Sequence, residues 1–454
     1  MKLNECVISF VIASSVTAVL AGCASDPNPI GYLDTKGGKS YVELDFNVSM
    51  TRADASATPE EEKLSKVNLY VFGVNGVLED THNDVAVSNG KVIIQASPGR
   101  KTIYAVTAGE LFTPVQDMTL DNFESEIFDS TLPQLKKDDG FVMAGKTEIG
   151  AIQNSSSPLN IPESNRFTIN LERLVAKVQV KADGLTLPSE LGFANLIETS
   201  FKVFQTNDEM RLVSDGTPVR TSFADEASPA GTYDTYTFDN QASAYLPVQT
   251  KSFQPDGCQY MSENIVAEPK SGNTTFVCVR LRAVPTELYV MGGNNIPNPE
   301  PNYNFSNPPT FYVYALMSPD GNIVDFYRGS KREIICIADK QSADQYKASH
   351  PELGNEVSGY SYKLLCYENA TVYYRINIAD DSAADLSSKY RILRNRFYKI
   401  QLNSLSRLGA PSESMLAPAD AGASLEGETS AGSWADATFN VTKWSEVDQT
   451  VENL

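Results

Sequence analysis

Apolar side chains recur at every second position in many short stretches of this chain, and this period constrains the fold more than any other feature. In the clearest stretch, Val42, Leu44, Phe46, Val48 and Met50 alternate with polar residues. Successive side chains of a strand point to opposite faces, so this period is typical of a strand with one buried face. The chain is therefore predicted to consist of strands that pack face to face.

Strand-like stretches continue along the chain, and turn sequences such as Asn75-Gly76 separate some of them. A chain of 454 residues exceeds what one core usually serves, and residues 182–192 are rich in Gly, Pro and polar residues. We expect an all-β protein with two transthyretin- or immunoglobulin-like β-sandwich domains and few short helices. The predicted domains are residues 53–184 and 185–411, with helix-like character in residues 120–135 and a long strand or bent pair in residues 167–182.

The N-terminal residues predict export and lipidation. Residues 1–22 contain Lys2 near their start, continue as an apolar run and end in Leu20-Ala21-Gly22, directly before Cys23. The apolar run is too short for a comfortable membrane span and fits a secretory signal. The four residues ending in Cys23 resemble the lipobox of bacterial lipoproteins, so residues 1–22 are predicted to be a lipoprotein signal peptide and Cys23 to carry lipid. The alternative is an ordinary signal with an incidental cysteine.

Charge and composition disfavour several functions. The formal net charge of −20 repels nucleic acid and anionic lipid, so no nucleic-acid partner is expected. His82 and His350 lie in polar surroundings, which we interpret as solvated loops, outside any nucleophile or metal motif. We therefore expect no enzyme activity, catalytic residue, cofactor or metal. Zinc is unlikely without a CxxC motif, and the disulfide pairing stays open for the cysteines of the C-terminal half, Cys258, Cys278, Cys336 and Cys366.

The C-terminal residues combine a tether with a strand. Residues 412–432 are rich in Ala, Gly, Ser and acidic residues and are predicted to be a flexible tether. The following strand has no evident partner, which indicates that it could be donated to another molecule. Alternatively, it closes the chain's own sheet. Its apolar row consists of Ala435, Ala437, Phe439, Val441, Val447 and Val451.

Five stretches occur in the order seen in fimbrillins, the structural subunits of type V pili, and the chain resembles this family over nearly its whole length. They are the lipobox, the strand that ends in Arg52, and the residues LERLVAKVQV (171–180), LRNRFYKIQLNSLSRLGAP (393–411) and TFNVTKW (438–444). Within the family, the chain looks closer to the major subunit of short fimbriae.

The resemblance implies assembly by exchange of strands. A lipidated precursor reaches the cell surface, where an Arg-specific or trypsin-like protease cuts after an arginine that corresponds to Arg52, so that Ala53 becomes the first residue. Residues 23–52 are then a propeptide whose strand is displaced, and residues 412–454 provide the tether and the donor strand. The displaced residues are Val42, Leu44, Phe46, Val48 and Met50, and the donor residues are Ala437, Phe439, Val441, Val447 and Val451.

The predicted function is that of a structural subunit, in the shaft of a surface fimbrium that supports adhesion. The expected partners are identical or related pilin subunits, tip and anchor subunits, the processing protease and, before processing, the outer membrane. The alternative is a surface-exposed lipoprotein that binds glycans, which would have no use for Arg52 or the terminal strand.

Overall fold

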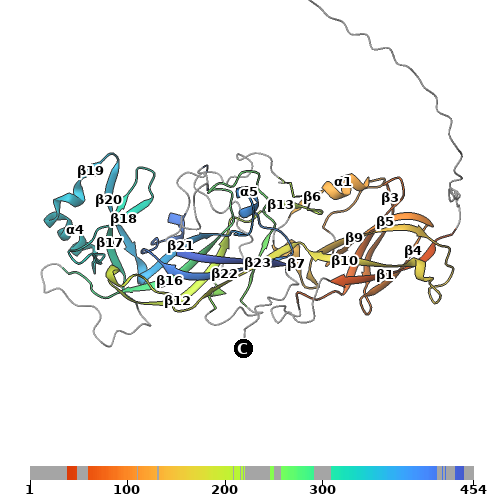
Figure 1. The fold of residues 1–454 in the computed structure, drawn as a ribbon, viewed down its shortest axis with the longest axis horizontal. Helices are drawn as coiled ribbons and strands as arrows, with labels where there is room; N and C mark the ends of the chain where they lie inside the picture. Colours follow the sequence, from red (N-terminus) through yellow and green to blue (C-terminus); the bar gives the residue numbers. More distant parts are fainter. Residues whose placement is uncertain are drawn as a thin grey trace, which may run out of the picture. The chain divides into compact units, whose positions relative to one another are not determined.

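The computed structural model describes residues 38–48, 60–109, 111–129, 132–207, 209–214, 216, 217, 219, 246–249, 257–290, 308–416, 422, 425 and 435–443. Residues 39–454 form one compact unit. Nearly all regular structure in the described residues is strand, which confirms the predicted all-β class (Figure 1).

The N-terminal half is built on a seven-stranded sheet in which β1 pairs parallel with β10 and antiparallel with β4. Its core consists of the inward residues of these strands, including Val42, Leu69, Ile94 and Ile169. In sheet order the strands are β3 (Leu78–Ala86), β2 (Lys66–Phe72), β5 (Gly99–Thr107), β9 (Met143–Ile152), β10 (Arg166–Arg173), β1 (Ser40–Val48) and β4 (Lys91–Ala96).

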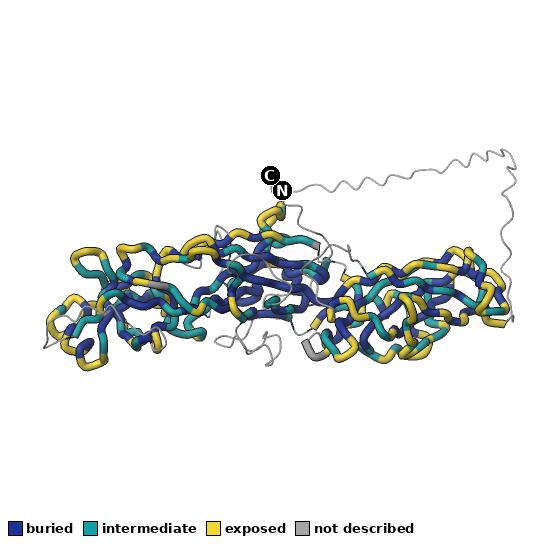
Figure 2. The backbone as a smooth tube through the Cα atoms, turned by 90° about the horizontal axis from the view of Figure 1, so that it is seen from below, coloured by how far each residue is buried: buried dark blue, intermediate teal, exposed yellow. Residues whose placement is uncertain are grey.

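Two four-stranded sheets share the core of the C-terminal half. The first contains β15 (Gln259–Ser262), β11 (Val175–Ala182), β22 (Arg396–Leu405) and β23 (Ala435–Lys443). The second contains β14 (Leu246–Pro247), β12 (Phe193–Phe204), β16 (Phe276–Pro285) and β21 (Thr371–Asn377). Buried residues follow much of these strands (Figure 2). β11 and β16 are buried along nearly their whole length, whereas buried and exposed residues alternate along β23, as expected for a strand with one buried face.

Smaller elements complete the described fold. A third four-stranded sheet contains β18 (Ile323–Phe326), β17 (Phe311–Met317), β20 (Tyr360–Tyr367) and β19 (Glu356–Val357), and two-stranded pairs join β13 (Glu209–Arg211) to β6 (Ile127–Asp129) and β7 (Lys136–Lys137) to β8 (Gly140–Phe141). The α-helices are α1 (Leu120–Ser125), α2 (Leu132–Leu135), α4 (Lys340–Ser349) and α5 (Leu386–Lys389). The 3₁₀ helices are η1 (Glu163–Asn165), η2 (Ser189–Leu191), η5 (Pro351–Gly354), η6 (Glu368–Ala370) and η7 (Glu413–Leu416).

Two sequence predictions differ from the structure in detail. Residues 120–135 contain two short helices with β6 between them, and Phe128 of β6 belongs to the same core as Phe123 of α1. Residues 167–182 form the predicted bent pair, β10 and β11, but the two strands belong to different sheets. The sheets change between β10 and β11, and the domain boundary at residue 184 stays a prediction.

Candidate strand-exchange site

Strand β1 occupies an interior place in its sheet. Val42 and Leu44 are fully buried, and Phe46 is only 7 % exposed. Val48 is half-buried and packs against the same core. Because β10 and β4 both pair with β1, removal of β1 would leave two strand edges unpaired on either side of an apolar slot.

The outward face of β1 also makes specific contacts. Asn47 Nδ2 donates a hydrogen bond to Asn170 Oδ1 on β10 at 3.0 Å. On the other side, Lys91 Nζ on β4 lies 3.0 Å from Glu43 Oε1 and 3.6 Å from Asp45 Oδ2. The hydrogen bond to Glu43, followed by the charges of Glu43 and Asp45, raises the pKa of Lys91. These contacts give the slot an amide on one side and a cation on the other.

A buried polar cluster holds the chain where the described residues resume after β1. The Glu61 carboxylate lies 3.2 Å from Lys177 Nζ and accepts a hydrogen bond from the Tyr260 hydroxyl at 2.8 Å. Arg173 donates to the Glu61 carbonyl oxygen from Nε at 3.1 Å and from Nη2 at 2.9 Å. Glu61, Arg173 and Lys177 are buried, so this cluster fixes residue 61 to strands of both halves. Glu61 could not be singled out from the sequence, because nothing there distinguishes it from Glu60 and Glu62.

The predicted processing and lipidation residues lie outside the described residues. These are Cys23, Arg52 and Ala53. The displaced-strand residue Met50 and the donor residues Val447 and Val451 also lie outside the described residues. Arg173 and Arg394 are described and are both buried. Arg394 lies in a turn before β22, where its Nη2 atom donates to Glu263 Oε2 at 2.7 Å. A protease needs extended, accessible backbone, so neither arginine offers a competing cut site.

The described part of the terminal strand lies in the chain's own sheet. β23 pairs antiparallel with β22 (Figure 1), and in this register Phe439 lies opposite Ile400. The predicted apolar row is present: Ala435, Ala437 and Phe439 are buried, and Val441 packs against the same core. The expectation that this strand has no partner of its own is therefore wrong for the isolated chain, because β22 offers a free edge and an apolar face next to it.

Some described residues of the predicted tether pack against the core. Leu425 is fully buried in the C-terminal core, and Met415 packs against that core. Residues Glu413–Leu416 form η7. Residues 412–432 contain few large apolar residues, but two of these, Met415 and Leu425, pack in or against the core.

The described residues were also compared with the expectations for disulfides, metal sites and membrane-spanning helices, and they show only ordinary structural surroundings. Cys258, Cys278, Cys336 and Cys366 form no disulfide with one another. Among the described residues, no group of His, Cys, Asp and Glu is placed to hold a metal ion. No helix in the described ranges is long and apolar enough to cross a membrane.

The two histidines differ from the predicted solvated loops. His82 lies half-buried in β3, where its Nε2 atom is 3.7 Å from Asp80 Oδ2. His350 follows α4, and its ring stacks on that of Tyr346 at 4.0 Å between centroids. Both rings therefore have structural contacts that the polar sequence around them did not indicate.

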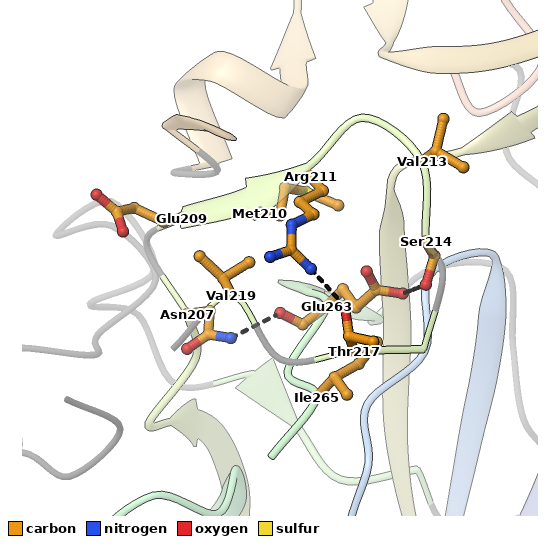
Figure 3. Close-up of a pocket in the computed structure, with 10 residues that line it drawn as sticks. All are labelled: Asn207, Glu209, Met210, Arg211, Val213, Ser214, Thr217, Val219, Glu263 and Ile265. Atoms are coloured by element: carbon orange, nitrogen blue, oxygen red, sulfur yellow. Dashed lines mark hydrogen bonds between the residues drawn. The ribbon is translucent and has the colours of Figure 1, made fainter. Parts of the chain in front are cut away.

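Two hollows in the described residues are candidate ligand sites. The first, shown in Figure 3, has a volume of about 10 Å³, room for no more than one water molecule, and Glu263 accepts a hydrogen bond from Ser214 at its edge. The second is a groove of about 400 Å³ across β12, β14, β16 and β21. In this groove, Arg282 pairs with Glu198 at 2.9 Å and Arg280 donates to Ser200 at 3.3 Å. The arginines are therefore occupied by the protein's own side chains.

Comparison with known proteins agrees with the resemblance noted in the sequence. Residues 365–450, which include β23, match the family described as "Major fimbrial subunit protein type IV, Fimbrillin, C-terminal". A search of curated proteins finds no match. The predicted resemblance to the fimbrillin family is therefore confirmed, on the match of this C-terminal region.

Solved structures similar to this chain include a fimbrilin (fimA) from Porphyromonas gingivalis W83, with 14% identity, coverage of 91% of this chain and 99% of that chain, and a TM-score of 0.45. The tip fimbrial protein Mfa3 from Porphyromonas gingivalis has 12% identity, coverage of 89% and 100%, and a TM-score of 0.42. A putative cell adhesion protein from Parabacteroides distasonis has 13% identity, coverage of 89% and 100%, and a TM-score of 0.45.

Proposed function

We propose that this chain, whose C-terminal region is that of the fimbrillin family of fimbrial subunits, is a shaft subunit of a surface fimbrium that polymerises by protease-triggered strand exchange. A cut after Arg52 makes β1 exchangeable, and the terminal strand of another copy takes its place. The observation that carries this proposal is the interior place of β1, between β10 and β4 and directly before the residues that contain Arg52.

The burial of β1 explains why a cut alone does not release it and why an empty slot must be refilled. Val42, Leu44 and Phe46 contribute roughly 1.5–3 kcal/mol each by burial. While the chain is intact, β1 is held near its slot at an effective concentration on the order of millimolar. After cleavage this advantage is lost, so β1 becomes exchangeable and a strand from another subunit competes with it.

The cluster around Glu61 supports the same sequence of events. The carboxylate and the carbonyl oxygen of Glu61 are both held by buried side chains. A cut between Arg52 and Ala53 therefore frees only the short stretch before residue 61, and the rest of the sheet stays in place. The slot keeps its two walls while it is empty.

The donor strand must leave its own sheet before it can be offered. β23 ends its sheet and has β22 as its one strand neighbour among the described strands, whereas β1 has two. An edge strand loses fewer backbone hydrogen bonds on release than an interior strand. The geometry thus favours release of β23 over unassisted release of β1.

Location and partners follow from the same proposal. Lipid on Cys23 anchors the precursor to the outer membrane by burial of acyl chains and leaves with residues 23–52. A chain with both a cut site and a donor strand suits the shaft, which contacts further pilin subunits at both ends and is completed by tip and anchor subunits. Mass spectrometry should find acyl chains on Cys23 of the precursor and Ala53 as the first residue of the mature subunit. A different first residue contradicts the assignment.

Treatment of the purified precursor with an Arg-specific protease tests the proposal. Wild-type protein should form a ladder of oligomers on unboiled denaturing gels that collapses on boiling, and Arg52→Ala should stay monomeric. Arg394→Lys serves as control, because that buried site should not be cut and the ladder should persist. Wild-type monomers that remain monomers after the cut contradict strand exchange and favour the alternative, a lipoprotein that binds glycans.

A further inference from the structure

The terminal strand repeats the sequence of β1. Residues 40–49 read SYVELDFNVS and residues 433–442 read SWADATFNVT, and they align without a gap. Identical pairs are Ser40 and Ser433, Phe46 and Phe439, Asn47 and Asn440, and Val48 and Val441. Chemically similar pairs are Tyr41 and Trp434, Glu43 and Asp436, and Ser49 and Thr442. A match of ten residues between two strands so far apart in the chain is too short to stand out in the sequence by itself.

The two strands also have the same pattern of burial. Phe46 and Phe439 are buried, with 7 % and 9 % of their surface exposed. The asparagine that follows each phenylalanine is exposed, and the next valine is half-buried. A strand that replaced β1 at this alignment would therefore point its apolar row to the core and its polar residues to the outside.

The outward residues specify a direction. A two-residue period lets the inward row fit a slot in either direction, so the inward row alone decides nothing. In the direction of β1, Asn440 takes the place of Asn47 beside Asn170, and Asp436 takes the place of Glu43 beside Lys91. If the strand were reversed about Phe439, Thr438 would lie beside Asn170 and the acidic residue would move away from Lys91. Only the direction of β1 restores both polar contacts.

We propose that the terminal strand of one copy enters the slot between β10 and β4 of the next copy in the direction of β1, at the register that puts Phe439 in the place of Phe46. The donor then runs parallel to β10 and antiparallel to β4. This inference rests on the proposed strand exchange and adds its partner residues, register and polarity.

A second explanation of the repeat is that β23 only fills a place in its own sheet, as β1 does in the seven-stranded sheet, without any exchange between copies. The strand neighbours argue against it. β1 lies beside a parallel strand, with Asn47 opposite Asn170. β23 pairs antiparallel with β22, with Asn440 opposite Lys399. In its own sheet Asp436 accepts a hydrogen bond from Asn403 at 3.2 Å, so this residue suits both places. The pairing of one asparagine with another, which Asn47 makes with Asn170, would be restored by Asn440 only in the place of β1, because Lys399 lies opposite Asn440 in β22.

Disulfide trapping between two differently labelled chains tests the register. The acceptor carries Asn170→Cys and the donor carries Asn440→Cys, both at exposed positions, in chains whose partly exposed cysteines are removed by Cys258→Ser and Cys366→Ser. Because Asn47 and Asn170 are directly paired, the two new thiols should lie at bonding distance after cleavage and mixing. We expect a mixed disulfide dimer that appears only after Arg-specific cleavage and disappears on reduction.

The matched control moves the donor thiol by two residues. Thr438→Cys is exposed on the same face of β23 and should give at least tenfold less mixed disulfide with Asn170→Cys. A stronger yield from Thr438→Cys than from Asn440→Cys overturns the proposed direction. Unboiled ladders without a disulfide from either donor overturn the register but leave strand exchange intact. Absence of ladders from the unsubstituted protein overturns both proposals. Circular dichroism of each chain before mixing verifies that the variants fold.

Discussion

At the scale of single residues, Glu61 stands out because both its carboxylate and its backbone carbonyl oxygen have buried polar partners. Its side chain and backbone bind Lys177, Tyr260 and Arg173 in a region where no part of the Glu61 or Lys177 side chain is exposed. A buried pair of this kind adds little net stability over an apolar pair, but removal of one charge is strongly destabilising.

We therefore expect Glu61→Gln to lower the free energy of unfolding by about 3 kcal/mol, because the lysine ammonium remains buried after the carboxylate charge next to it is lost. Urea unfolding of the precursor measures the change. Asp344→Asn is the matched control, since its pair with Lys340 is largely exposed and should contribute less than about 1 kcal/mol. Equal effects of the two substitutions would contradict the structural role of Glu61.

His82 predicts how stability depends on pH. Burial lowers its pKa below the ordinary value, and the charge of Asp80 only partly opposes this effect. The folded state therefore binds fewer protons than the unfolded state just below pH 6.5, the ordinary histidine value, so stability is lost as the pH falls through that range. The melting temperature of the wild type should fall more between pH 7.5 and pH 5 than that of His82→Gln. Parallel profiles would show that His82 is not the group responsible.

At the scale of elements, β23 is part of its own sheet before any exchange. Phe439 packs in the C-terminal core, and Thr438 beside it points outward. Phe439→Ala should lower the free energy of unfolding of the uncut precursor by about 3 kcal/mol, and Thr438→Ala by less than about 0.5 kcal/mol. Chemical unfolding compares the two. If they unfold alike, β23 does not close its own sheet.

The strands were largely predictable from the sequence, whereas their partners were not. The alternation from Val42 to Val48 depends only on neighbouring residues and is visible in the letters. The pairing of β1 with β10 joins residues far apart in the chain, and no local pattern encodes it. For the same reason β23 seemed to have no partner, and the sequence did not show that Leu174, a single buried residue, separates strands of two different sheets.

At the scale of the whole assembly, the fit of the donor strand in the slot of β1 explains why cleavage must precede exchange. At the proposed register Ala437 replaces Leu44, which is fully buried. Truncation of a buried leucine to alanine costs about 3–5 kcal/mol, because the cavity fills only partly. The joint between subunits is then weaker than the precursor's own β1, so wild-type chains should not exchange strands until the cut removes the covalent link.

Ala437→Leu should shift this balance. In the slot of the next copy, the added side chain fills the space of Leu44 and should stabilise the joint by about 2 kcal/mol. In its own sheet, Ala437 is buried opposite Leu402, so a larger residue should overpack that core by about 1–3 kcal/mol and favour release of β23. The temperature at which cleaved ladders dissociate on unboiled gels should therefore rise, while the uncut precursor melts earlier. Thr438→Leu, whose side chain points outward, should leave the dissociation temperature of the ladder unchanged. Ladders of Ala437→Leu that dissociate at the wild-type temperature would show that Ala437 does not enter the place of Leu44.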